Sequence, residues 1–213
     1  MTWFATSIGQ SGGGGNSFTK TMIMDNSALE STLAFTSDYH NYDLLEFVTL
    51  NTYVANNVGV HRFLTSPEII DAILQYSSNQ ITLNEFNSNQ YSCYSKTSDT
   101  VFTQGGNRNL ACVAVYGIKY SGTVSKTAFY SRQSLGSSDV TVTSSDSFFD
   151  YDIILFSTCT TLADETILCA NTVYKDELYT LKLNKYDSYR MVTVSENSIT
   201  AYQYFYVQGI KFS

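Results

Sequence analysis

The chain has 213 residues and a formal net charge of −7, and it contains 17 Tyr and 13 Phe. This acidic balance argues against partners that are bound mainly through Lys and Arg, so we expect neither nucleic acid nor a membrane as a partner. Charged residues make up only 15% of the chain and aromatic residues another 15%, which excludes a disordered protein. Because Tyr, Phe and Thr suit strands, the composition predicts an all-β fold.

The first 17 residues combine a short apolar start with a run of four glycines. Trp3, Phe4 and Ile8 are apolar, and Gly12–Gly15 resemble a flexible linker. The start lacks the basic region of a signal peptide, and no run is long enough for a membrane span, so we expect a soluble protein made in a cytoplasm. Two interpretations stay open: residues 1–16 anchor the chain to a larger assembly, or they fold back on the rest.

Four short segments recur in the same order, which indicates an internal duplication. The matched pairs are Thr19–Met24 with Ser125–Tyr130, Asn41–Phe47 with Asp150–Phe156, Thr82–Tyr91 with Thr180–Tyr189, and Tyr116–Tyr120 with Gln208–Phe212. Their offsets are 106, 109, 98 and 92 residues (125−19, 151−42, 189−91, 209−117), so the first copy carries 11 and then six extra residues. We therefore expect an arm and linker over residues 1–17 and two tandem modules over residues 18–121 and 122–213.

The larger insertion in the first copy predicts the only helix of the chain. Ser66 can cap a helix, and Pro67 suits the first helical position. One apolar face follows at helical spacing, made of Ile69, Ile70, Ile73 and Leu74. The smaller insertion contains Gln104–Asn109, whose glycines and asparagines predict a turn-rich loop.

Elsewhere the apolar residues alternate with a period of two, which predicts strands. Clear examples are Val140–Thr143, Tyr179–Leu183 and Met191–Val194. Ile153–Phe156 is apolar throughout, as expected of a strand that is buried on both faces. Ser195–Ser198 fits a hairpin turn.

About six to eight short strands in each copy predict two tandem antiparallel β-sandwich modules, with one short helix inserted in the first. A strand containing Gly-Ile-Lys closes the sheet of each copy. We expect Gly117 and Gly209, in these strands, to occupy positions where a bulge or close packing excludes a side chain.

The sequence offers little for catalysis, so we predict a protein that is not an enzyme and has no cofactor. His40 and His61 are the two histidines, and both fall in the first copy. His40 stands beside Tyr39 at the start of a strand that is predicted to be buried, which favours a hydrogen-bonded structural role over a catalytic base.

We also predict no metal site. The four cysteines, Cys93, Cys112, Cys159 and Cys169, make no Cys-x-x-Cys pair and have no histidine at ligand spacing, so we interpret them as reduced, mostly buried thiols. Four acids of the second copy could offer calcium its oxygen ligands. They are Asp150 and Asp152, predicted to share a strand face, and Asp164 and Glu165 in the next loop, and solvated turn carboxylates are the favoured interpretation.

Three tyrosines are the weak candidates for ligand binding. Tyr202, Tyr204 and Tyr206 alternate along one face of a predicted strand. Such a stripe could stack on sugar rings, or it could pack under the neighbouring copy or another subunit, where tyrosine keeps its hydroxyl wet and buries its ring. The packing role is favoured.

The Asn41-Tyr42-Asp43 segment followed by apolar residues, together with the closing Tyr116-Gly117-Ile118-Lys119 strand, resembles the receptor-binding tip or knob modules of bacteriophage tail fibres and related virion fibres. In those modules the two motifs bracket one β-sandwich. The resemblance covers residues 42–119 and, with Gln208 in place of the tyrosine, residues 151–211. It implies a virion structural protein of the tail or fibre apparatus (a knob, decoration or adaptor), assembled in the host cytoplasm, with host attachment as a further role.

The same resemblance implies contact with other virion or tail proteins through residues 1–16, and a homo-oligomer with three subunits as the expected state. One alternative is a carbohydrate-binding module that contacts a host-surface glycan through its tyrosines. A hydrolase of surface polysaccharide, using acids such as Asp150 or Asp152, is less favoured because that chemistry needs two acids facing each other across a cleft.

Overall fold

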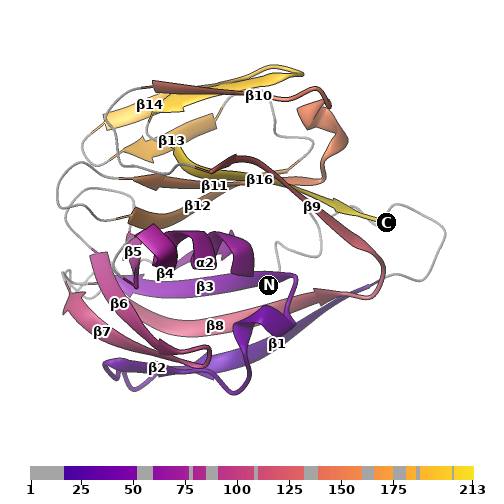
Figure 1. Cartoon of the computed structure of the whole chain (residues 1–213). Coiled ribbons are helices and arrows are strands. Elements are labelled where there is room, and N and C mark those ends of the chain that lie inside the picture. Colours follow the sequence, from indigo (N-terminus) through magenta and orange to yellow (C-terminus); the bar gives the residue numbers. More distant parts are fainter. Residues whose placement is uncertain are drawn as a thin grey trace.

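The described part of the chain folds mostly into strands, nearly all of them paired antiparallel, with one α-helix (Figure 1). The all-β class predicted from the sequence is therefore confirmed. The computed structural model describes residues 17–51, 60–76, 79–84, 91–107, 110–131, 139–159, 166–174, 181–185, 188–202 and 204–213. Residues 1–16, which carry the predicted arm, lie outside these ranges. Within them, no helix is long and apolar enough to cross a membrane.

A four-stranded antiparallel sheet forms the centre of the first half. Its order is β1-β8-β3-β4, with bounds Phe18–Asp25, Leu110–Tyr120, Leu44–Asn51 and Val60–Thr65. Gly117 of β8 pairs with Thr21 of β1 on one side and with Leu45 of β3 on the other. This triplet fixes the register of the three strands.

The second half repeats this arrangement with four later strands. They run in the order β9-β16-β11-β12, with bounds Val124–Ser131, Tyr204–Phe212, Ile153–Cys159 and Thr166–Tyr174. Gly209 pairs with Thr127 and with Ile154. These partners follow those of the first half by 92, 106 and 109 residues (209−117, 127−21, 154−45), the offsets found in the sequence. The bounds of the two predicted modules stay a prediction.

Each half has a second set of four strands. In the first half the order is β2-β7-β6-β5, with bounds Thr32–Ala34, Val101–Asn107, Tyr91–Ser98 and Gln80–Asn84. In the second half it is β10-β15-β14-β13, with bounds Asp139–Thr143, Ser198–Tyr202, Ser188–Val194 and Leu181–Lys185. The hairpin turn predicted at Ser195 is confirmed, because its N–H donates to the Ser198 carbonyl at 2.7 Å.

The two halves share one sheet. Thr82 of β5 pairs in parallel with Ile167 of β12, which joins strands of both halves into an eight-stranded sheet. They also share one apolar cluster, which includes Phe47 of the first half and Ile210 of the second. Buried apolar side chains from both halves thus form a continuous core.

Helix α2 (Pro67–Tyr76) confirms the predicted helix and belongs to this shared core. Ser66 accepts a hydrogen bond from the N–H of Ile69 at 3.3 Å, as a helix-capping residue does. The predicted apolar face is buried, with exposed fractions of 0–7% for Ile69, Ile70, Ile73 and Leu74. In Figure 1 the helix lies between β3 and β12, and it contacts β12 and β5.

Both glycines of the Gly-Ile-Lys strands are required by close packing, as predicted. A Cβ on Gly117 would overlap the ring of Tyr42, and one on Gly209 would overlap the rings of Tyr151 and Phe129. The prediction that these strands close the sheets was wrong, because β8 lies between β1 and β3 and β16 lies between β11 and β9. Ile153, Ile154 and Leu155 are all fully buried, which confirms a strand covered on both faces.

Two predictions of local structure were wrong. Gln104–Asn107 belongs to β7 rather than to a loop, because the pairing of β6 with β7 shifts at this point and takes up the glycines as an irregularity in the ladder. Tyr202 and Tyr206 do not share a strand, since β15 ends at Tyr202 and β16 begins at Tyr204.

Candidate functional site

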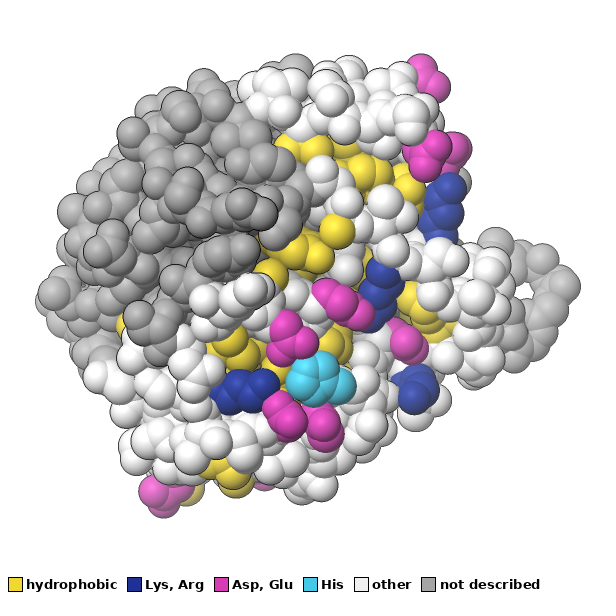
Figure 2. All heavy atoms as spheres, in the orientation of Figure 1, with side chains coloured by type: hydrophobic (Ala, Val, Ile, Leu, Met, Phe, Trp, Pro, Cys, Tyr) yellow, Lys and Arg dark blue, Asp and Glu magenta, His cyan; other side chains and the backbone are white. Residues whose placement is uncertain are grey.

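The most concentrated group of charged side chains in the described part surrounds His40, in the first half. His40 belongs to η1 (Tyr39–Asn41), a short 3-10 turn that leads into β3. Figure 2 shows a histidine open on this face of the molecule, with acidic and basic side chains around it. The strand start predicted for His40 is corrected to this turn.

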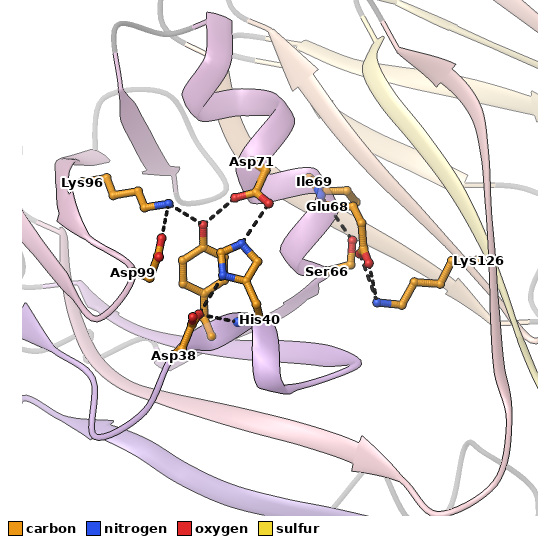
Figure 3. Close-up of polar contacts among 10 residues, drawn as sticks. Asp38, His40, Ser66, Glu68, Ile69, Asp71, Lys96, Asp99 and Lys126 are labelled. Atoms are coloured by element: carbon orange, nitrogen blue, oxygen red, sulfur yellow. Dashed lines mark hydrogen bonds and ion pairs between the residues drawn. The ribbon is translucent and has the colours of Figure 1, made fainter.

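His40 lies between two carboxylates from different elements (Figure 3). Its Nδ1 is 2.7 Å from Oδ1 of Asp38, and its Nε2 is 2.9 Å from Oδ2 of Asp71 in α2. A carboxylate oxygen only accepts hydrogen bonds, so both contacts are satisfied when both ring nitrogens carry a proton. Burial lowers the pKa of His40, but the hydrogen bonds and charges of Asp71 and Asp38 outweigh it, and the net shift is upward.

Asp38 also fixes the start of the turn. Its Oδ1 accepts from the backbone N–H of His40 at 2.9 Å, which caps η1. This backbone hydrogen bond is the largest influence on the Asp38 carboxyl, whose pKa is lowered. The carboxylate therefore both orders the turn and contacts the imidazole.

Tyr39 extends the network into the core. Its ring is fully buried and stacks on the His40 ring, with 4.0 Å between centroids. Its hydroxyl donates to Oδ1 of Asp71 at 2.5 Å and accepts from Nζ of Lys96 at 3.0 Å, and Lys96 pairs with Asp99 at 2.6 Å. Burial, followed by the hydrogen bond to Asp71, raises the pKa of Tyr39.

We interpret this group as an ion-pair network. Asp38, His40 and Asp99 each bring a nitrogen or oxygen atom within 4.8 Å of one another, a spacing that a cation could bridge. However, Lys96 already supplies positive charge to Asp99, and Asp38 is engaged with the backbone and ring of His40. We therefore do not assign these residues as metal ligands.

The network belongs to the first half alone. The 109-residue offset places Ser147 at the position of Asp38 and Phe149 at that of His40, in turn η2 (Phe148–Asp150). Ser147 keeps the capping role, because its hydroxyl accepts from the N–H of Phe149 at 3.2 Å. The cap is thus common to both halves, and the charges are not.

Helix α2 is also tied to the second half (Figure 3). The Ser66 hydroxyl donates to Oε1 of Gln208 in β16 at 2.6 Å, and Nζ of Lys126 in β9 lies 2.9 and 3.0 Å from the two carboxylate oxygens of Glu68. The helix therefore links both halves through polar contacts.

The acids considered for calcium have other roles where the structure describes them. Asp150 and Asp152 do not share a strand face, since Asp150 ends η2 and Asp152 lies in the bend before β11. Asp152 accepts from the N–H of Phe212 at 2.8 Å, just as Asp43 accepts from Tyr120. Asp164 and Glu165 lie outside the described residues.

The three candidate tyrosines are not brought together as one described surface. Tyr206 is 9% exposed and lies in the core, which suits packing rather than a ligand, while the side chains of Tyr202 and Tyr204 lie outside what the structure describes. Cys93 and Cys112 are buried thiols, as predicted; the structure does not describe the side chains of Cys159, Cys169 and His61.

Sequence reasoning missed most of the His40 network. Asp71, Lys96 and Asp99 are 31, 56 and 59 residues from His40 (71−40, 96−40, 99−40), so only Asp38, two residues away, gave a local signal. No family model matches the chain, and neither a curated protein nor a solved structure is significantly similar to it.

Proposed function

We propose that this chain is a structural protein of a bacteriophage particle, acting as a knob, decoration or adaptor of the tail or fibre apparatus, with host-surface attachment as a further role. The observation that carries the proposal is the packing of the two short motifs on which the family resemblance rests. In each half the Tyr-Asp segment lies on the Gly-Ile-Lys strand: Tyr42 covers Gly117, and Tyr151 covers Gly209. The aspartates that follow, Asp43 and Asp152, accept from the N–H groups of Tyr120 and Phe212 at 2.8 Å.

The His40 network supports a structural role better than a catalytic one. Each polar side chain in it has a protein partner at hydrogen-bond distance, and the tyrosine that joins the charges is buried. A catalytic base needs a face turned to a substrate. Here both ring nitrogens of His40 contact carboxylates.

Particle composition tests the proposal directly. We expect the protein in particles purified on a density gradient, in constant ratio to other structural proteins, and we expect deletion of residues 1–16 to remove it while the circular dichroism of the deleted protein is unchanged. Absence of the full-length chain from particles would contradict the virion role. Incorporation of the deleted form would contradict only the anchoring role of the arm.

The oligomer and the glycan alternative need separate measurements. Light scattering on the purified protein should give the mass of a trimer. On a glycan array, we expect the protein to bind no glycan through Tyr204. A binding signal that is lost in Tyr204→Ala would instead favour the carbohydrate-binding alternative.

A further inference from the structure

We propose that Asp38, His40 and Asp71 form a proton-dependent latch, which ties helix α2 to turn η1 and opens as the imidazole loses its second proton. The two ring nitrogens face carboxylate oxygens of different elements, at 2.7 Å for Asp38 and 2.9 Å for Asp71. Neutral imidazole has one N–H and one lone pair. After deprotonation, one of these carboxylates therefore faces a lone pair instead of a donor.

The charges around the ring also favour a closed latch when His40 is protonated. The groups that face His40 or its partners are Asp38 before η1, Asp71 of α2, the buried hydroxyl of Tyr39, Lys96 of β6 and Asp99 of the following turn. With His40 protonated, two cations stand against three carboxylates. With His40 neutral, Lys96 alone remains, and it is already placed between Tyr39 and Asp99. The acidic groups of η1 and α2 then repel each other with less compensation.

The latch acts on the element that links the halves. Asp71 connects α2 to the first half, whereas Ser66 and Glu68 connect it to Gln208 and Lys126 of the second. Opening of the contact between His40 and Asp71 therefore loosens one end of a bridge whose other end stays attached, while the hydroxyl of Tyr39 in η1 still donates to Asp71. The second half has Ser147 and Phe149 at the positions of Asp38 and His40, so it has no equivalent device there.

The direction of the pH effect follows from the two protonation states. The latch holds the proton on His40, so the raised pKa of this residue and the closed latch are linked. Closure is complete below the ordinary imidazole value of 6.5 and is lost as pH rises through the higher value in the folded protein. In strong acid the carboxylates of Asp38 and Asp71 become protonated and lose their charge, which also opens the latch.

Nuclear magnetic resonance of the full chain tests the proposal. In a His61→Gln protein, His40 is the remaining histidine, and its ring carbon–proton signal can be followed from about pH 5 to about pH 9. We expect its midpoint above 6.5, and we expect the backbone amides of Asp71 and Ala72 in α2 to shift with the same midpoint. A midpoint at or below 6.5, or α2 amides that do not follow it, would overturn the latch.

Variants separate the latch from a merely structural contact. Asp71→Asn removes one carboxylate and should lower the His40 midpoint and abolish the titration of the α2 amides. Asp150→Asn, which removes an exposed acid from turn η2 of the second half, is the matched control and should leave both unchanged. An unchanged midpoint in Asp71→Asn, with the fold verified by the remaining amide signals, would also refute the proposal.

Discussion

The ring of Tyr42 occupies the space that a side chain on Gly117 would need. The same relationship holds between Tyr151 and Gly209 in the second half. The absence of a side chain at each glycine therefore allows an aromatic ring to pack directly over an internal strand, β8 in the first half and β16 in the second.

Replacing Gly117 with alanine should destabilise the protein by about 1–3 kcal/mol, the range for overpacking a filled core. The added methyl group would overlap Tyr42, and relief requires the ring to move off the strand. Unfolding by urea, followed by tyrosine fluorescence or circular dichroism, measures the change.

Gly105→Ala is the matched control for this substitution. The nearest atoms to its new methyl group would be Nε2 of Gln80 at 3.4 Å and Oγ of Ser95 at 3.5 Å, ordinary contacts with side chains that can adjust. We expect a clearly smaller effect there. Equal losses at both glycines would contradict the packing argument.

Removing the hydroxyl of Ser66 should destabilise the protein more than removing that of Ser147, although both residues cap a helical turn. Ser66→Ala loses a cap and leaves the buried amide of Gln208 without this donor, for a total of about 2–4 kcal/mol. Ser147→Ala loses the cap alone, about 1 kcal/mol. Thermal unfolding of the two variants side by side compares them, and a larger loss for Ser147→Ala would show that the Ser66–Gln208 contact contributes nothing.

Glu68→Gln should lower the free energy of unfolding near neutral pH but not in acid. Burial raises the pKa of Glu68, but the hydrogen bond and charge of Lys126 outweigh it and the net shift is downward. The ion pair therefore stabilises above the reference value of 4.5, and its contribution is lost as pH falls through the lower value in the folded protein. Because the Glu68 side chain is 45% exposed, we expect only about 0.5–1 kcal/mol.

Denaturant unfolding of Glu68→Gln and the parent at several pH values measures this difference. Glu196→Gln serves as the control, since Glu196 is an exposed acid of the hairpin turn between β14 and β15. A difference that persists in acid would argue against the ion pair as its cause.

Cys112 should resist alkylation in the folded protein. Burial raises the pKa of its thiol, and the side chain has an exposed fraction of 0%. Only the thiolate reacts rapidly, so modification must wait for an opening of the structure. We expect a rate about 100-fold or more below that of the unfolded chain, measured on the Cys112 peptide by mass spectrometry after iodoacetamide treatment at about pH 8. Rapid labelling under native conditions would contradict its burial.

The repeat and the helix could be predicted because their signals are local. Similar short segments in the same order indicate the duplication, and Ser66, Pro67 and the apolar face after them define α2. Gly117 and Gly209 were also predictable, since a glycine inside a strand usually marks a bulge or a close approach.

The rest depends on where distant segments meet. The parallel pairing of Thr82 with Ile167, and the contacts of His40 with Asp71, arise from tertiary packing and leave no periodic pattern in the sequence. At Gly105 and Gly106 the opposite happened: a local signal was present, and it predicted the wrong structure. Their composition is typical of a loop, but pairing with β6 keeps them in a strand.

The first and last residues that the structure describes, Ser17 and Ser213, are both hydrogen-bonded to the short link between β8 and β9. The N–H of Ser17 donates to the Ser121 hydroxyl at 2.8 Å, and the N–H groups of Thr123 and Ser213 donate to each other's carbonyls. Nearby, the rings of Phe18 and Phe212 are 4.9 Å apart. Ser17 and Ser213 thus lie at one point of the structure, so a label fused after Ser213 reports on the surroundings of residue 17.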